Sequence, residues 1–183
     1  MTGVMSVCLI AAAYLLVFLE ALGFPFRHWL GTQIDFLPGL MVYAGLKGGL
    51  VNSISIALIG GILFDSVSAN PLAISVLPLL VVGGIAHWNR EVVLQDQLFA
   101  QFVLGTISSA AAPLMTVVSL YGIGASPLLG WGSLWQWLLL ALGGGLATPL
   151  IFQTLIRFEK AFSHPPLLET SYRADREIKR GRI

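Results

Sequence analysis

The hydrophobic residues of this chain form long runs separated by short polar breaks. The first run extends from about Val4 to Phe24 and is long enough to cross a bilayer core of about 30 Å. Pro25, Arg27 and His28 end it. No Lys or Arg precedes the run, so we expect a retained membrane span rather than a cleaved signal peptide.

The second and third runs are short and closely joined. Ile34–Leu46 and Leu50–Phe64 are separated by Lys47, Gly48 and Gly49. One uninterrupted helix over both runs would be too long for a bilayer at about 1.5 Å per residue. The two glycines and the charge therefore predict a tight helical hairpin, with each arm marginal as a full span.

Three further runs complete the pattern. A turn is predicted from Asp65 to Pro71, because Asp, Ser, Asn and Pro favour turns. The runs that follow extend over Leu72–Trp88, over Leu98–Tyr121 with an interruption at Pro113, and over Trp131–Phe158. The sequence thus predicts an all-α polytopic membrane protein with about six transmembrane helices, of which the second and third are short.

Composition supports a membrane class and separates a body from a tail. The chain is 56% hydrophobic and only 10% charged, whereas soluble domains carry about 25% charged residues. Seven of the ten Lys and Arg residues lie from Arg157 onward. We therefore expect one transmembrane domain over residues 1–160 and a charged cytoplasmic tail over 161–183. Such a tail suits contact with anionic lipids better than nucleic acid, since no folded basic domain accompanies it.

Loop charges predict the orientation. With six spans both termini share one side, and Lys47, Arg90 and the basic tail lie on that side too. Arg27 is the only Lys or Arg on the other side. The positive-inside rule then places both termini in the cytoplasm.

Three acidic residues lie in or beside the apolar runs. Asp35 is placed to cap the second helix, with Pro38 in its first turn, and Asp65 is placed to close the turn after the third. Glu20 lies near the end of the first run, where it is expected to extend outward to the interface. We favour structural roles for these acids at the ends of the runs, where water or lipid headgroups can solvate them. The alternative is functional, because ionisable groups inside membranes are costly and often serve activity.

No catalytic or metal-binding set is predicted. His28, His87 and His164 fall in three separate places and lack metal-ligand spacing. No nucleophile elbow or phosphate-binding glycine loop is present. We therefore expect no enzyme activity, no metal and no cofactor.

Small residues form stripes that favour close helix contact. Gly105 and Ser109 lie four residues apart on the fifth run, and Ala141 and Gly145 on the sixth. Two interpretations stay open, namely packing within this chain and a docking face for a partner's transmembrane helix.

One stretch carries an ordered set of motifs between Ile34 and Ile85. The pieces are Asp35-Phe36-Leu37-Pro38, then Val42-Tyr43-Ala44-Gly45-Leu46-Lys47-Gly48-Gly49, then Gly60-Gly61-Ile62-Leu63-Phe64-Asp65, and then Ser68-Ala69-Asn70-Pro71-Leu72-Ala73. In this order they resemble the rod shape-determining protein MreD family. The end of the last run, from Thr148 to Glu159, is similar as well. Asp35 precedes Pro38 instead of following a proline, and Ala73 stands where the family often has Gly.

The resemblance implies a scaffold without enzyme activity. Members of the family are bacterial inner-membrane proteins of the cell-shape (elongation) machinery. They associate with the bitopic membrane protein MreC, and through the complex with the actin-like MreB filament and the peptidoglycan synthases. The residues that the resemblance and the stripes single out as structural or interface candidates are Asp35, Pro38, Lys47, Gly48, Asp65, Pro71, Gly105 and Ser109.

A second hypothesis belongs to another class of protein. Substrate-binding S components of vitamin-uptake transporters also have about six helices and a similar size. Such a protein would use the small-residue stripes to dock a coupling subunit. The predicted outer loops, however, offer few polar groups to hold a vitamin.

Overall fold

The computed structural model describes residues 2–22, 31–68, 70–93, 97–125, 127 and 130–162. Within these ranges the fold is all-α, with six α-helices and one short π-helical segment. The elements are α1 (Thr2–Ala21), α3 (Leu37–Tyr43), η1 (Ala44–Gly48), α4 (Leu50–Val67), α5 (Val76–Trp88), α6 (Leu98–Gly122) and α7 (Trp131–Phe162). From residue 163 on, the predicted tail lies outside the described residues, as do residues 23–30 with Arg27 and His28.

Helix length and hydropathy make this a multi-pass membrane protein. In the described part, α4, α6 and α7 are long and apolar enough to cross a bilayer. The apolar stretch of α1 and the whole of α5 are shorter. The outward faces of these helices are apolar, as at Val7, Val51 and Val118, which suits contact with lipid.

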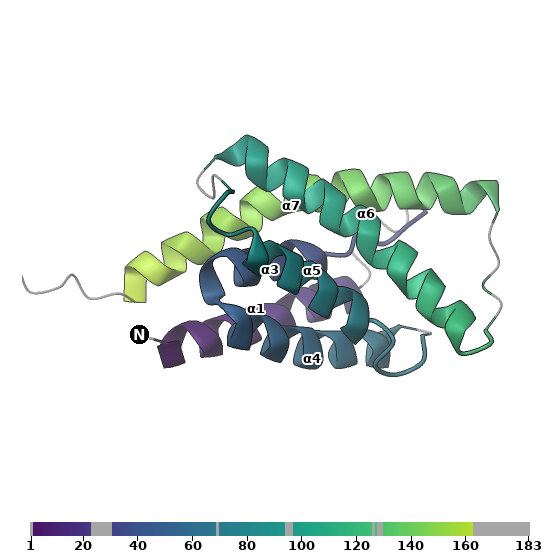
Figure 1. Cartoon of the computed structure of the whole chain (residues 1–183), viewed down its shortest axis with the longest axis horizontal. Helices are drawn as coiled ribbons and strands as arrows, with labels where there is room; N and C mark the ends of the chain where they lie inside the picture. The colour runs from purple at the N-terminus through teal and green to yellow at the C-terminus, as the bar shows by residue number, and fades with distance from the viewer. Residues whose placement is uncertain are drawn as a thin grey trace, which may run out of the picture.

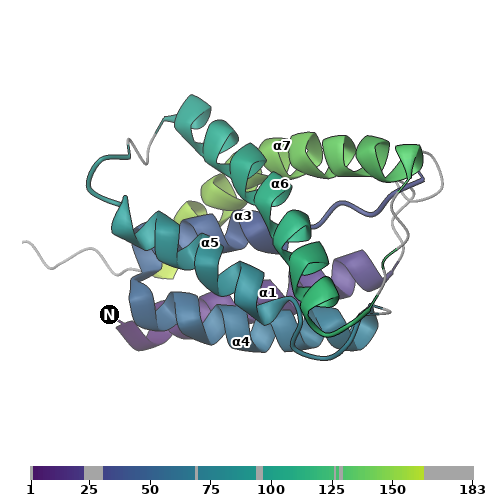
Figure 2. The same cartoon turned by 45° about the vertical axis from the view of Figure 1, so that its right-hand side comes forward.

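The helices surround a short central segment. Helices α1 and α4 lie side by side along one edge of the molecule, whereas α7 lies along the opposite edge and α6 packs on it while crossing it at an angle (Figures 1 and 2). Between these pairs lies α3, which contacts α5, α6 and α7. The chain reaches α3 from the end where α1 finishes and continues through η1 toward the end where α1 begins.

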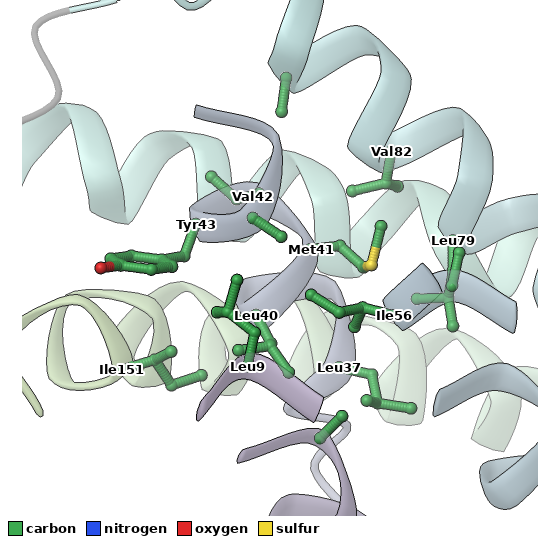
Figure 3. Packing of buried hydrophobic residues seen from close by; sticks show 14 of the residues in the cluster. Leu9, Leu37, Leu40, Met41, Val42, Tyr43, Ile56, Leu79, Val82 and Ile151 are labelled. Carbon is green, nitrogen blue, oxygen red and sulfur yellow. The ribbon is translucent and has the colours of Figure 1, made fainter. Parts of the chain in front are cut away.

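Large apolar side chains of α3 form the centre of the core. All seven residues of α3 are buried. Figure 3 shows Leu37, Leu40 and Met41 surrounded by side chains of other helices. Tyr43 packs edge-on against Phe152 of α7, with ring centroids 4.9 Å apart. A segment that is apolar on every side avoids water, and here the five other α-helices of the described part all contact it.

Glycine allows η1 to approach α5 closely. A Cβ atom on Gly45 would lie 2.6 Å from both the Gly83 carbonyl oxygen and the Ala86 Cβ atom. Gly49 then ends η1 with φ +83°, a conformation that favours glycine. The predicted break between the two runs is confirmed, because α4 begins at Leu50, but it is confined to Gly49, since Lys47 and Gly48 still belong to η1.

Small residues also allow α6 and α7 to approach each other closely. A Cβ atom on Gly105 would lie 2.6 Å from the Thr148 Cβ atom and 3.1 Å from the Gly144 carbonyl oxygen. Ser109 faces Gly144 one turn further along α6. Such positions let two backbones approach closely in a membrane.

Several predicted boundaries are wrong. The second helix begins at Leu37, because residues 33–36 have no regular structure, and the third continues to Val67 instead of ending at Phe64. The fourth begins at Val76, after turns over residues 72–75. Pro113 does not interrupt α6, which is assigned as helix through it. The predicted starts at Leu98 and Trp131 are confirmed.

Candidate functional site

Three acidic residues from separate elements gather at one end of the bundle. Glu20 comes from the last turn of α1, Asp35 precedes α3, and Asp65 lies in the last turn of α4. The carboxyl group of Asp35 is close enough to those of Glu20 and Asp65 for electrostatic interaction with each. These residues lie 15 to 45 positions apart in the sequence, so the fold alone brings them together.

Asp65 closes the turn between α4 and α5. Its Oδ2 atom accepts a hydrogen bond from the Ser75 backbone N–H at 3.0 Å, and its Oδ1 atom accepts one from the Ser75 hydroxyl at 2.6 Å. Asp65 is only 2% exposed, so the expectation that water or headgroups solvate it is wrong. Two donors from Ser75 satisfy the buried carboxylate instead.

Asp35 and Glu20 hold the first amides of the central segment. The Leu37 N–H donates to Asp35 Oδ1 at 2.9 Å, and the Phe36 N–H donates to Glu20 Oε1 at 2.6 Å. Pro38 lies in the first turn, as predicted. Because Glu20 is buried and turned toward Phe36, the expectation that it extends outward to the interface is wrong.

A small polar cavity lies beside Glu20. Its volume is about 110 Å³. The described residues that line it are Val17, Glu20, Ala21, Gln33, Phe64, Val67 and Ser68. Within the described part of the chain, Glu20 Oε2 has no hydrogen-bond partner. This oxygen has less than 1 Å² of accessible surface, so protein atoms enclose it and it does not open into the cavity.

A second, larger hollow runs along the side of the bundle. It measures about 620 Å³ and lies between α1 and α7, with Phe36 also in its lining. Nearly all of its lining is apolar, including Ala11, Leu15 and Leu150. We call this surface the lateral groove.

Basic residues of the described part lie at the opposite end from the acids. Lys47 lies in η1, Arg90 follows α5, and Arg157 and Lys160 lie near the end of α7. Figure 1 shows these three elements reaching the same end as the N-terminus, whereas α1 and α4 finish at the other. The predicted charge asymmetry is therefore present along the bundle.

Other predicted candidates have structural surroundings. Gly48 packs beside Leu9 and Asn52, whose side-chain amide donates to the Gly48 carbonyl oxygen at 2.8 Å. The Ser6 hydroxyl donates to Asn52 Oδ1 at 2.7 Å and so ties α1 to α4. Pro71 begins the turn before α5, and its carbonyl oxygen accepts from the Ile74 N–H at 3.3 Å.

Gly105 and Ser109 face α7 of the same chain. Ser109 is 2% exposed. This placement favours packing within the chain over a docking face for a partner. His87, the one histidine in the described part, lies 3.3 Å from the Gly45 carbonyl oxygen through Nδ1. The described residues hold no group of three or more His, Cys, Asp or Glu suited to a metal ion.

Sequence reasoning missed the links to Glu20 and the cavity beside it. The signal available was an acid in the last turn of an apolar helix, but its partner, the Phe36 amide, lies 16 residues further on. Comparison with models of known families, with curated proteins and with solved structures found no match.

Proposed function

We propose that this protein is a non-enzymatic membrane scaffold of the bacterial cell-shape complex, which binds an MreC-like bitopic partner and thereby helps to organise lateral peptidoglycan synthesis. The observation that carries the proposal is where the MreD-like stretch lies. Asp35 and Asp65 sit together at one end of the bundle and Lys47 at the other, with α3 between them in the core. The motifs resemble the family in order and spacing, and they also form one connected unit.

The turn before α5 gives further support. Ala73 has φ +69°, a left-handed conformation that favours glycine. The resemblance places Gly at this position in the family. Ala73 departs from the family's Gly, yet its backbone has a conformation that favours glycine, which is what we expect if the turn geometry is shared.

Within this proposal the chain crosses the membrane six times with both termini in the cytoplasm. The second crossing consists of residues 33–36, α3 and η1, and is enclosed by the other helices. Non-helical backbone at membrane depth is tolerated where protein surrounds it. The basic end of the bundle is then the cytoplasmic one.

We assign the lateral groove to the transmembrane helix of the bitopic partner. It lies between two helices and is apolar along its length. Ala11, Ala12 and Ala147 are small residues that let a helix backbone come close. The 110 Å³ polar cavity, by contrast, is well below the ~300–1,000 Å³ of typical small-molecule sites. The lateral groove falls within that range, but its nearly all-apolar lining offers few polar groups to orient a vitamin, which favours the scaffold over vitamin uptake.

The test is purification of the tagged protein from its native membrane in gentle detergent, with mass spectrometry of the bound chains. We expect a bitopic protein with a periplasmic coiled coil, together with actin-like and cell-wall synthesis proteins. Recovery of a coupling membrane subunit with paired ATPases would instead establish the transporter hypothesis.

Groove variants make the same test specific. Ala11→Trp and Leu150→Trp place bulk in the groove and should reduce recovery of the bitopic partner severalfold. Ile107→Trp, on the exposed face of α6, is the matched control and should leave recovery unchanged. Equal recovery with all three variants would remove the groove from the interface.

A further inference from the structure

We propose that α6 is hinged at Pro113 and that Trp137 of α7 supplies a hydrogen bond that the hinge needs when α6 bends. The hinge is independent of the proposed scaffold function. All buried residues of α6 lie before Pro113, namely Gln101, Gly105, Ser108, Ser109 and Ala112. From Pro113 to Gly122 every residue is half-buried or exposed. The packed part of α6 therefore ends at the proline, and we call Pro113–Gly122 the outer arm.

Pro113 weakens the backbone of α6 at this boundary. Because proline has no N–H group, the Ser109 carbonyl oxygen lacks its helical donor, and the proline ring crowds that carbonyl group. Sharp bends in helices occur at such positions. The Thr116 hydroxyl also donates to the Ala112 carbonyl oxygen at 3.0 Å, a kind of bond that often bends helices. This is therefore where α6 bends most easily.

The indole ring of Trp137 lies at the same point. Its N–H group donates to the Ala110 carbonyl oxygen at 2.8 Å. Within the helix that oxygen pairs with the Leu114 N–H group, which moves away when the outer arm bends. No water replaces a lost hydrogen bond inside a membrane, so a donor from a neighbouring helix makes a proline bend tolerable. Trp137 is such a donor, and the bend then leaves Ala110 with a partner.

The surroundings of the outer arm leave it free to change its angle. Beyond their close contact at Gly105, α6 and α7 diverge, and the end of α6 lies away from the start of α7 in both views (Figures 1 and 2). Leu114 and Val118 on the arm are exposed and apolar, so lipid can surround them. A segment with few buried contacts opens at a low free energy.

Pro149 in α7 provides an internal comparison. It leaves the Gly145 carbonyl oxygen without a helical donor in the same way. Buried residues flank it on both sides, however, with Thr148 before it and Phe152 after it, each 0% exposed. Core packing therefore fixes α7 at Pro149, whereas the outer arm of α6 has no buried residue to fix it. The arm can thus open and close one end of the bundle while the contact at Gly105 stays in place.

The experiment uses the full-length protein in lipid nanodiscs. Cys8, the only cysteine, is replaced by Ala, and pairs of spin labels are attached to new cysteines at Val51 and Val118, or at Val51 and Ile107. All three side chains are exposed, so the labels avoid the core. Pulsed electron paramagnetic resonance then measures the distribution of distances, with Val118 as the probe of the outer arm and Ile107 as the probe of the packed half.

We expect a bent population for the Val51–Val118 pair and a single narrow distribution for the Val51–Ile107 pair. Trp137→Phe should reduce the bent population about tenfold, because the bend then leaves a carbonyl oxygen at membrane depth without a donor. Pro113→Ala should abolish the bent population, because the backbone hydrogen bond to Ser109 is restored.

Two matched controls should leave the bent population unchanged. They are Trp135→Phe, at an exposed tryptophan of the same helix as Trp137, and Pro149→Ala. A Val51–Val118 distribution as narrow as that of Val51–Ile107 would overturn the proposal. So would a bent population that persists in both Pro113→Ala and Trp137→Phe, and if one of these variants fails to fold, the other decides.

Discussion

The central part of the chain, residues 31–88, and the α6–α7 hairpin solve the same packing problem in opposite ways. The central part buries large apolar side chains, such as Leu40 and Met41, and fixes its turns with carboxylates. In α6 the buried residues are small or polar, with Gly105 and Ser109 among them, while large residues such as Val118 face outward. In a membrane protein hydrophobicity therefore does not identify the inside of a helix, because both the core and the lipid are apolar.

The largest loss of stability is expected where η1 contacts the backbone of α5. Gly45→Ala would place a methyl group 2.6 Å from the Gly83 carbonyl oxygen, which cannot move as a side chain can. We expect a loss of about 3 kcal/mol in the free energy of unfolding. Unfolding by SDS in mixed micelles measures it. The control is Gly84→Ala, because no atom lies within 4 Å of the added methyl group. Equal behaviour of the two variants would contradict the tight contact between η1 and α5.

Next is the carboxylate that closes the α4–α5 turn. Asp65→Ala leaves the Ser75 N–H and hydroxyl without their buried acceptor, so we expect a loss of about 2 kcal/mol. Asp65→Asn keeps one acceptor oxygen and should cost less. The same unfolding assay applies, and co-purification of the partner shows whether Asp65 also acts in assembly. If Asn lowers recovery of the partner without lowering stability, the residue has a role beyond the turn.

A substitution in the α6–α7 contact should lower the free energy of unfolding by less. Gly105→Ala would bring a methyl group within 2.6 Å of the Thr148 Cβ atom, but its nearest backbone contact, the Gly144 carbonyl oxygen, lies at 3.1 Å, so we expect a loss of about 1–2 kcal/mol. Gly122→Ala, at the end of the same helix with open space around it, is the control for helix propensity. A cost as large as that of Gly45→Ala would mean that the hairpin is as rigid as the centre.

The smallest expected effect is an increase in stability. Ala73→Gly relieves a left-handed conformation that costs an L-residue roughly 1–2 kcal/mol, but it also adds freedom to the unfolded chain. We expect a net stabilisation of about 0.5 kcal/mol. A shift in the thermal unfolding midpoint of the purified protein measures it, and destabilisation would argue that the turn does not adopt this conformation.

Much of the fold could be predicted from local patterns. Lys47, Gly48 and Gly49 break an apolar stretch, so the start of α4 follows from the sequence, as does the start of α7 at Trp131. The end of α4 could not be predicted in this way. Asp65 was expected to leave the helix for water, yet Ser75, ten residues later, satisfies it inside the protein.

The candidate site was less accessible to sequence reasoning. Asp35 and Pro38 carry a local capping pattern and could be assigned to the start of a helix. The position of Glu20 depends on the Phe36 amide, and the cavity needs α1, α4 and the segment before α3 together. Such relations depend on tertiary structure, which single-sequence periodicity does not encode.

The shortness of α3 and η1 also constrains how the protein is made. Together they span Leu37–Gly48, about 18 Å of helix at ~1.5 Å per residue, too little to cross the ~30 Å hydrocarbon core alone. Their neighbours include α7, which is synthesised after every other described helix. Before α7 is made, α1 and α4 can cover this segment only in part. The segment is fully enclosed only after α7 has been synthesised, so we expect its membrane insertion and its folding to be completed together.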